Sequence, residues 1–339
     1  MTLNFSTLKI YAALLLITFG ISCGNNPLDI DVSHVQITLE VNHFEKDLFQ
    51  SQGTFSADAI QKLNTKYPSF FQDFTRNVIN IGTMEHPSFP NRLSSFVLDP
   101  DINQIHKDAK NLYADFSPYE THLKNAFQYY KYYFPDKTIP KIITYISGFN
   151  YAVITDDNYL GIGLDMFLGK DYPTYPQLGY PMYKINSMTK EHLVVGAVMG
   201  WIATEFELEE TQANLLTEMI HQGKILYLLD ALMPKTDNTL KINYSLAQLS
   251  WCENNEEQIW FFFIDNKLLY NKETKEILKY MGEAPFTQGF PEGSPGRVGH
   301  WLGWQIVKAY MKNNPTVTIP QLMQENDAQK ILTQSKYKP

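Results

Sequence analysis

The predicted helix from Thr211 to Met233 carries the pattern that comes closest to known catalytic chemistry in this chain. Thr217, Glu218 and His221 have the spacing of the zinc-peptidase pattern His-Glu-x-x-His, in which two histidines one helical turn apart bind zinc and the glutamate polarises the metal-bound water. Threonine replaces the first histidine here, and its neutral hydroxyl is a poor substitute for imidazole. Because a catalytic zinc normally has three protein ligands, we expect a degenerate site without catalytic residues, metal or cofactor.

The surrounding sequence nevertheless indicates a relationship to zinc peptidases. A predicted β-hairpin precedes the helix, as it does in those enzymes, and Glu256 lies on a later predicted helix, where many of them place a third ligand. Without this context, Glu-x-x-His would be an ordinary polar pair on a helix. We therefore expect a zincin-like scaffold. The alternative is a zinc-dependent metallopeptidase with an atypical site, in which Glu218 is the base and His221 a ligand.

A second candidate region is the Gly/Pro-rich loop that leads into a helix predicted from Pro295 to Asn313. Arg297 falls in the first turn of that helix, where the helix dipole slightly disfavours a cation. We therefore expect a specific partner for Arg297, either a buried carboxylate or a bound anion. Trp301 and Trp304 are further binding candidates, although core anchors are their simplest interpretation. Gly299 and Gly303, four residues apart, predict the close approach of another helix.

The elements that must position these residues begin with a small sheet in the middle of the chain. Strands are predicted from Lys141 to Ile146, from Tyr151 to Ile154 and from Tyr159 to Leu164, with turn residues between them. They predict an antiparallel sheet. The alternation of apolar and polar residues from His34 to Phe44 predicts one more, half-buried strand.

The rest of the chain is predicted to be mainly helical. A short sheet beside a helical body indicates the α+β class, and no linker is long enough to force a boundary within a single domain at 34–339. Helices are predicted at Thr189–Glu207, Thr211–Met233, Ser245–Leu269, Lys272–Met281 and Pro295–Asn313.

The N-terminal residues predict export and lipid attachment. Lys9 precedes an apolar run from Ile10 to Ile21, which is too short to span a bilayer and is typical of a signal peptide. Small residues before Cys23 resemble the bacterial lipobox, although Gly20 stands where leucine is usual. We expect a signal peptide at 1–22, acylation of Cys23, a tether at 23–33, and attachment to a cell-envelope membrane whose leaflet stays open. The alternative is ordinary signal cleavage beside a coincidental cysteine.

Composition excludes several other classes of protein. The 339 residues carry a formal net charge of −8 without a basic stripe, which argues against nucleic acid as the main partner. With only two cysteines the chain cannot be a disulfide scaffold, and Cys252 is expected to be a buried hydrophobe.

Four stretches of the chain stand out, at 43–49, at 219–234, at 251–256 with 259–260, and at 293–299 with 301–307. They resemble the gliding motility lipoprotein family GldB of Bacteroidetes. The resemblance implies an envelope lipoprotein of the gliding machinery, which is linked to the type IX secretion system, and a distant relationship to zincins. It implies no known enzymatic activity, so no catalytic residue is carried over.

Three functions follow as hypotheses. The first is a pseudoenzyme that is anchored to the membrane by lipid and binds other gliding and secretion envelope proteins through the aromatic loops Asp171–Tyr183 and Phe286–Ser294. The second is the atypical zinc peptidase. The third is an envelope protein that binds a peptide or glycan in the former peptidase cleft, with Arg297 as its anchor.

Overall fold

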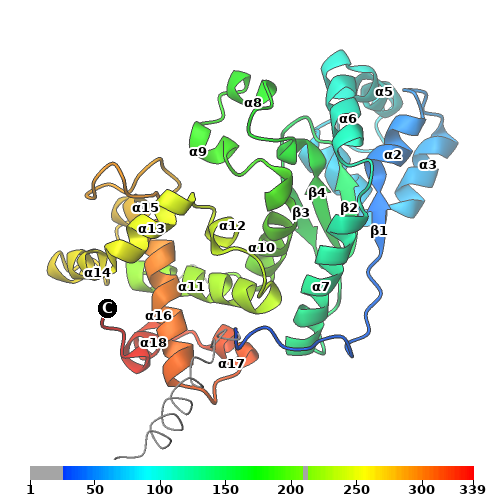
Figure 1. Cartoon of the computed structure of the whole chain (residues 1–339). Helices are drawn as coiled ribbons and strands as arrows, with labels where there is room; N and C mark the ends of the chain where they lie inside the picture. The colour runs from blue at the N-terminus through cyan, green and yellow to red at the C-terminus, as the bar shows by residue number, and fades with distance from the viewer. Residues whose placement is uncertain (1–25, 209–212) are drawn as a thin grey trace, which may run out of the picture.

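The structure, a computed structural model, describes residues 26–208 and 213–339. A small sheet with helices around it lies beside a wholly helical body (Figure 1). This arrangement confirms the predicted mainly helical α+β class. The predicted signal peptide and Cys23 lie outside the described residues. Within the described residues, no helix combines the length and the apolar character needed to cross a bilayer.

The sheet has four strands in the order β1-β2-β4-β3. The strands are β1 (Val41–His43), β2 (Lys141–Tyr145), β3 (Val153–Asp156) and β4 (Tyr159–Gly163). Only β3 and β4 pair antiparallel, whereas β2 lies parallel to both β1 and β4. The prediction of an antiparallel sheet was therefore wrong for these two pairs. The sequence shows the β3–β4 hairpin, but it does not show that β4 returns between β3 and β2.

The burial of β4 explains why it takes the interior position. All five of its residues are buried, as is typical of a strand covered on both faces. Gly161 leaves no room for a larger side chain, because a Cβ there would lie 3.1 Å from the Tyr145 ring and 3.2 Å from the Phe70 ring. The strand predicted at 34–44 is regular only at β1, and Val35, Ile37 and Leu39 before it pack against the core around the sheet.

The N-terminal half adds helices around the sheet. Its core is rich in aromatic residues, with Phe44 in edge-on contact with Tyr67, Phe70 and Phe74. The helices are α2 (Phe44–Gln50), α3 (Ala57–Lys66), α4 (Pro68–Asp73), the π-helix η1 (Phe74–Val78), α5 (Phe89–Leu98), α6 (Pro100–Leu112), α7 (Ser117–Tyr133), η2 (Leu164–Phe167), α8 (Thr174–Gln177), α9 (Met182–Ile185) and η3 (Lys190–His192).

The C-terminal body follows the predicted pattern of helices with two corrections. The helix predicted from Ser245 to Leu269 is interrupted at Asn255, whose side-chain amide donates to the Trp251 carbonyl and ends the first segment. The last long helix begins at Val298 instead of Pro295. The elements are α10 (Leu193–Glu205), α11 (Leu215–Leu232), α12 (Asn238–Ile242), α13 (Leu246–Asn254), α14 (Glu256–Asp265), α15 (Thr274–Met281), α16 (Val298–Asn313), α17 (Ile319–Gln324) and α18 (Ala328–Ser335).

Helix α11 belongs to two hydrophobic cores at once. Ile225, Leu228 and Leu229 pack into the core around the sheet. Met219 and Leu226 pack into the core of the helical body. Because one helix is buried in both cores, the position of the helical body relative to the sheet depends on α11.

Helices α11 and α16 cross at two glycines. A Cβ at Gly303 would overlap with the Met219 carbonyl oxygen, and a Cβ at Gly223 would collide with the Gly303 carbonyl. A Cβ at Gly299 would meet the Met281 sulfur and the Tyr280 carbonyl. These contacts confirm the predicted close approach of another helix to Gly299 and Gly303.

A buried ionic cluster lies further along the same pair of helices. The Asp230 carboxylate accepts from Lys241 Nζ at 2.8 Å and from Trp304 Nε1 at 2.8 Å. Lys308 lies 3.8 Å from the same carboxylate, above the Trp304 ring. Because Lys241 is only 4 % exposed and Asp230 is its ion-pair partner, removal of Asp230 would leave Lys241 as an unpaired buried charge.

Substitution of Gly303 by alanine tests the helix crossing. We expect Gly303→Ala to lower the free energy of unfolding by at least about 2 kcal/mol, because its Cβ must displace the α11 backbone. Gly196→Ala on α10 is the matched control, since its Cβ would lie 3.5 Å from Phe167, an ordinary contact. It should stabilise the protein by up to about 1 kcal/mol through helix propensity. Urea unfolding measures both values, and a Gly303→Ala protein as stable as the unmodified one would contradict the tight crossing.

Candidate functional site

The residues of the predicted motif lie in the first turns of α11, where each has a different environment. Asn214 caps the helix, and its Oδ1 accepts from the Thr217 backbone N–H at 3.0 Å and from the Thr217 hydroxyl at 3.1 Å. The hydroxyl at the position of the missing histidine therefore takes part in the helix cap.

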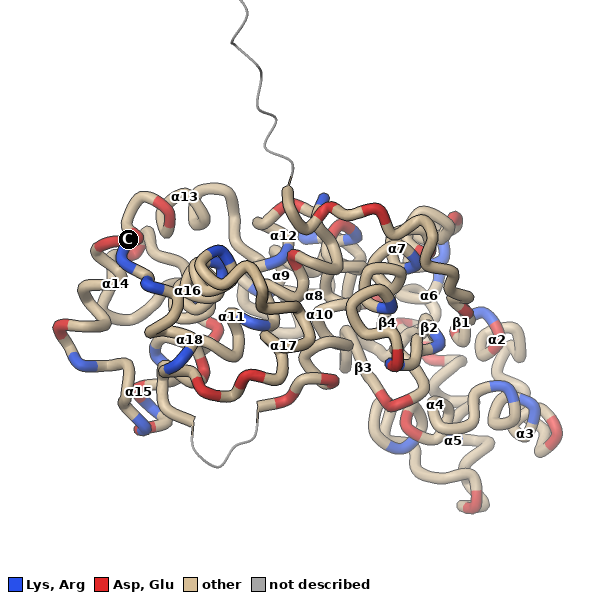
Figure 2. Tube along the Cα trace, turned by 90° about the horizontal axis from the view of Figure 1, so that it is seen from below, with Lys and Arg blue, Asp and Glu red and all other residues tan. Residues whose placement is uncertain are grey.

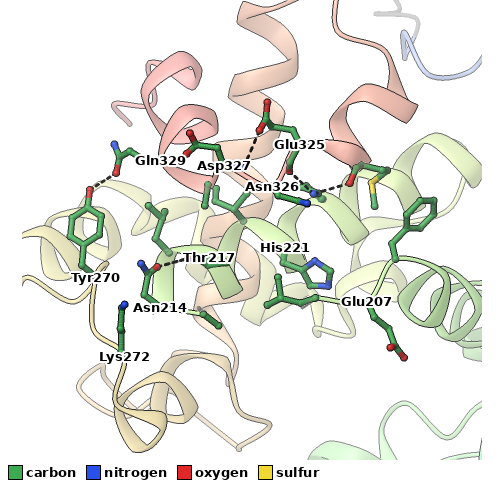
Figure 3. Close-up of a pocket in the computed structure, with 18 of the residues that line it drawn as sticks. Glu207, Asn214, Thr217, His221, Tyr270, Lys272, Glu325, Asn326, Asp327 and Gln329 are labelled. Carbon is green, nitrogen blue, oxygen red and sulfur yellow. Dashed lines mark hydrogen bonds between the residues drawn. The ribbon is translucent and has the colours of Figure 1, made fainter. Parts of the chain in front are cut away.

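His221 lines a cleft of about 660 Å³ beside α11. Figure 3 shows its ring on the wall between Thr217 and Glu207, with Tyr270 and Lys272 on one rim. The segment Glu325–Asp327, which joins α17 to α18, also lines the cleft, and Gln329 of α18 accepts a hydrogen bond from the Tyr270 hydroxyl at the rim. We call this the His221 cleft.

Burial keeps the His221 imidazole neutral. Desolvation, together with the smaller effect of the nearby positive charge of Lys224, lowers the pKa of His221 to about 4. A neutral imidazole offers one hydrogen-bond donor and one acceptor to anything that enters the cleft. It is also the form that binds metal ions.

Lys224 joins the wall of the cleft to the end of α17. Its ammonium donates to the Met323 carbonyl at 3.0 Å and to the Glu325 carbonyl at 2.8 Å. These are among the last carbonyls of α17, which have no partner inside the helix. Burial lowers the pKa of Lys224 to about 8. The sequence analysis missed this residue, although a lysine inside the apolar stretch 223–232 was a signal for a buried cation.

The other two residues of the expected metal site are not brought to the cleft. Glu218 is half-buried, burial raises its pKa, and it is not part of the cleft wall. Glu256 accepts a hydrogen bond from the Tyr337 hydroxyl at 2.6 Å. Across 26–208 and 213–339, no three His, Cys, Asp or Glu side chains are grouped so that they could hold a metal ion.

The β-hairpin that suggested a peptidase context belongs to a different helix. Helix α10 is the first long helix after the hairpin and packs against β3 and β4, while α11 packs chiefly against α16. The hairpin therefore does not place Glu218 and His221 beside the sheet edge. Sequence order alone could not show this, because both helices come after the hairpin in the chain.

Comparison with known protein families gives a match that covers nearly all of the chain. The family model of the gliding motility protein GldB matches residues 25–339. The chain belongs to the GldB family. The resemblance found in the sequence is thereby confirmed, and with it the assignment to a family of gliding-motility lipoproteins of the cell envelope. No curated protein and no solved structure gives a significant match. The expected relationship of GldB to zincin-type peptidases stays a prediction.

Arg297 of this GldB-family chain lies at a second cavity, apart from His221. It precedes α16 in the left-handed conformation, with φ of 58°, instead of lying in the first helical turn. Its guanidinium donates to the Ile242 carbonyl at 3.1 Å and lies 3.8 Å from Glu283, a carboxylate that is 45 % exposed. The expected partner is thus a carboxylate at the surface. The cavity has a volume of about 520 Å³, and Lys170 and His192 also line it.

The two tryptophans that were binding candidates lie in the core of the GldB fold. Trp301 is 1 % exposed and Trp304 is fully buried. Neither lines the His221 cleft or the Arg297 cavity. Their rings support α16, so any role in binding would be indirect.

The low pKa of His221 predicts a loss of stability in acid. The unfolded chain binds the proton near the ordinary pKa of 6.5, whereas the folded protein resists protonation down to about pH 4. Unfolding therefore takes up a proton in this range, and stability falls as the pH drops below 6.5. Between pH 7 and pH 5, the unmodified protein should lose about 1–2 kcal/mol more than His221→Gln, measured by urea unfolding.

His34→Gln is the control for this experiment, because it removes an exposed histidine outside both cavities. Between pH 7 and pH 5, the free energy of unfolding of His34→Gln should fall by the same amount as that of the unmodified protein. Equal pH dependence in His221→Gln and the unmodified protein would show that the imidazole is solvated instead of buried.

Proposed function

We propose that this chain is a non-catalytic, lipid-anchored protein of the gliding and type IX secretion machinery that binds a partner envelope protein in the His221 cleft. The observation that carries the proposal is the cleft itself. It is a preformed cavity in the size range of ligand sites, about 300–1,000 Å³, and within residues 26–208 and 213–339 no set of metal ligands is assembled beside it.

The bonding of the α11 side chains supports binding over hydrolysis. The Thr217 hydroxyl caps the helix, and the Lys224 ammonium holds the end of α17. Both groups are therefore engaged in the fold itself and are not free to activate a water molecule. His221 stays available as a neutral hydrogen-bonding group, which suits recognition of a peptide backbone.

The chemistry of the cleft walls favours a segment of protein as the occupant. Ile220 and Met323 give apolar surface, while Glu207 and Tyr270 give polar groups at the rim. Mixed walls of this kind suit an extended loop or chain end with alternating apolar and polar side chains. The aromatic loops also present apolar surface, since Met182 is 63 % exposed and Phe286 is 42 % exposed.

Each of two alternative functions is supported by a specific observation. His221 is neutral, and Glu218, three positions before it on α11, has a raised pKa, so the two residue types suit a ligand and a base of an atypical zinc peptidase. The cavity beside Arg297 and Lys170 is suited to a peptide carboxylate or an acidic glycan. The experiments below separate these alternatives from the proposal.

Photocrosslinking in living cells tests for a partner in the His221 cleft. A photoreactive amino acid at Gln329, an exposed residue of the rim, should capture a specific envelope protein. The same amino acid at Gln61, an exposed residue of α3 that lines no cavity described above, should not capture it. Capture of the same proteins from both positions, or of none from Gln329, would contradict partner binding in this cleft.

His221→Gln separates a scaffold from a zinc enzyme. Glutamine keeps a neutral donor and acceptor but is a poor zinc ligand, so gliding should persist in cells whose only copy carries His221→Gln. The purified protein should contain far less than one zinc per chain. Loss of gliding in His221→Gln, together with stoichiometric zinc in the unmodified protein, would favour the peptidase.

A further inference from the structure

The segment that was predicted to be a tether lies against the folded body from Asn26 onward. Asn26 Nδ2 donates to the Pro234 carbonyl at 3.0 Å, next to the end of α11. Asp29 lies 3.4 Å from Lys235 Nζ and accepts from the Tyr129 hydroxyl at 3.1 Å. Val32 is only 5 % exposed. Figure 1 shows the segment running from the side of α11 and α17 past α7 to β1.

Because these contacts begin at Asn26, only a short stretch of chain separates the folded body from Cys23, the residue that would carry the lipid. Cys23 and Asn26 are three positions apart. Three residues of fully extended chain span at most about 10–11 Å. An acylated Cys23, held at the level of the lipid headgroups, would therefore keep Asn26 within that distance of the bilayer surface.

We infer that the surface around Asn26, Pro234, Lys235 and Lys312, here called the seat face, rests against the lipid headgroups, so that the His221 cleft opens away from the membrane. This inference rests on the acylation of Cys23 in the proposed function. Lys312 belongs to the seat face because it lines the same surface cavity as Asn26 and Pro234.

The side chains of the seat face fit a headgroup surface better than the hydrocarbon interior. Lys235 is 79 % exposed, and Lys312, Asp237 and Asn238 are exposed around it. None of the large exposed apolar residues of the described chain lies in 26–36, 234–241 or 311–317. Mixed charges without apolar anchors can contact polar headgroups, whereas insertion into the bilayer would require apolar side chains.

The His221 cleft lies on the other side of the molecule. In Figure 2 the described chain begins at the top, beside α12, and the two chain ends that flank residues 209–212 lie at the bottom. Leu208 and Ala213, which form those two ends, both line the His221 cleft. A partner that enters the cleft would thus approach from the side away from the bilayer.

Fluorescence quenching in vesicles tests the orientation. The native acylated protein is reconstituted in phosphatidylethanolamine vesicles that contain a lipid with a nitroxide on its headgroup. A fluorophore is attached to Lys235→Cys on the seat face or to Gln329→Cys on the cleft rim, while the buried Cys252 stays unlabelled. We expect the fluorophore at position 235 to be quenched several-fold more than the one at position 329. Equal quenching, or stronger quenching at 329, would overturn the inference.

A longer tether is the matched control. Ten Gly/Ser residues inserted between Gly24 and Asn25 add a root-mean-square reach of about 17 Å. The insertion should remove the excess quenching at position 235 while the protein still floats with the vesicles. Unchanged excess quenching would show that the short tether does not set the orientation. If the native protein does not float with the vesicles, acylation fails and the proposed function fails with it. If the protein floats with the vesicles but the fluorophores at positions 235 and 329 are quenched equally, only the inferred orientation is wrong.

Discussion

The whole arrangement depends on the contact between α11 and α16, where backbone meets backbone at Gly223 and Gly303. Because no side chain separates the two helices there, neither can slide or rotate without a collision. Helix α11 also gives residues to the core around the sheet, so this one crossing sets the position of the helical body relative to the sheet. The wall of the His221 cleft is a face of the same helix.

The polar residues of α11 connect it to the elements around it. Lys224 binds the end of α17, and Asp230 binds Lys241 on α12 and Trp304 on α16. A helix with so many structural contacts is rigid, and rigidity favours binding because less conformational freedom is lost on association. The same contacts explain how a helix can keep the spacing of a peptidase motif while its polar groups hold the fold together.

The sequence was most informative where a residue acts through its local environment. The α+β class, the β3–β4 hairpin and the close approach at Gly299 and Gly303 follow from periodicity, turn residues and small side chains. The parallel pairing of β2 could not be predicted, because it depends on where β4 returns in space. The prediction that the hairpin precedes and supports the motif helix was wrong for the same reason. Helix α10 packs against β3 and β4, whereas α11 packs chiefly against α16. Arg297 and Glu283 come together only because α15 and α16 pack, and Lys224 meets α17 across 99 positions of the chain.

The seating of residues 26–33 also has a mechanical consequence. Machinery that moves cells over surfaces works under load, and pulling on an acylated Cys23 would transmit force into the body at Asn26. There the segment holds the end of α11 through Pro234 and Lys235, and it holds α7 through the Tyr129 hydroxyl, which bonds to Asp29 and to the Ile30 carbonyl. Tension would therefore be shared between the helical body and the sheet half. The anchor would pull on both halves together instead of peeling one from the other.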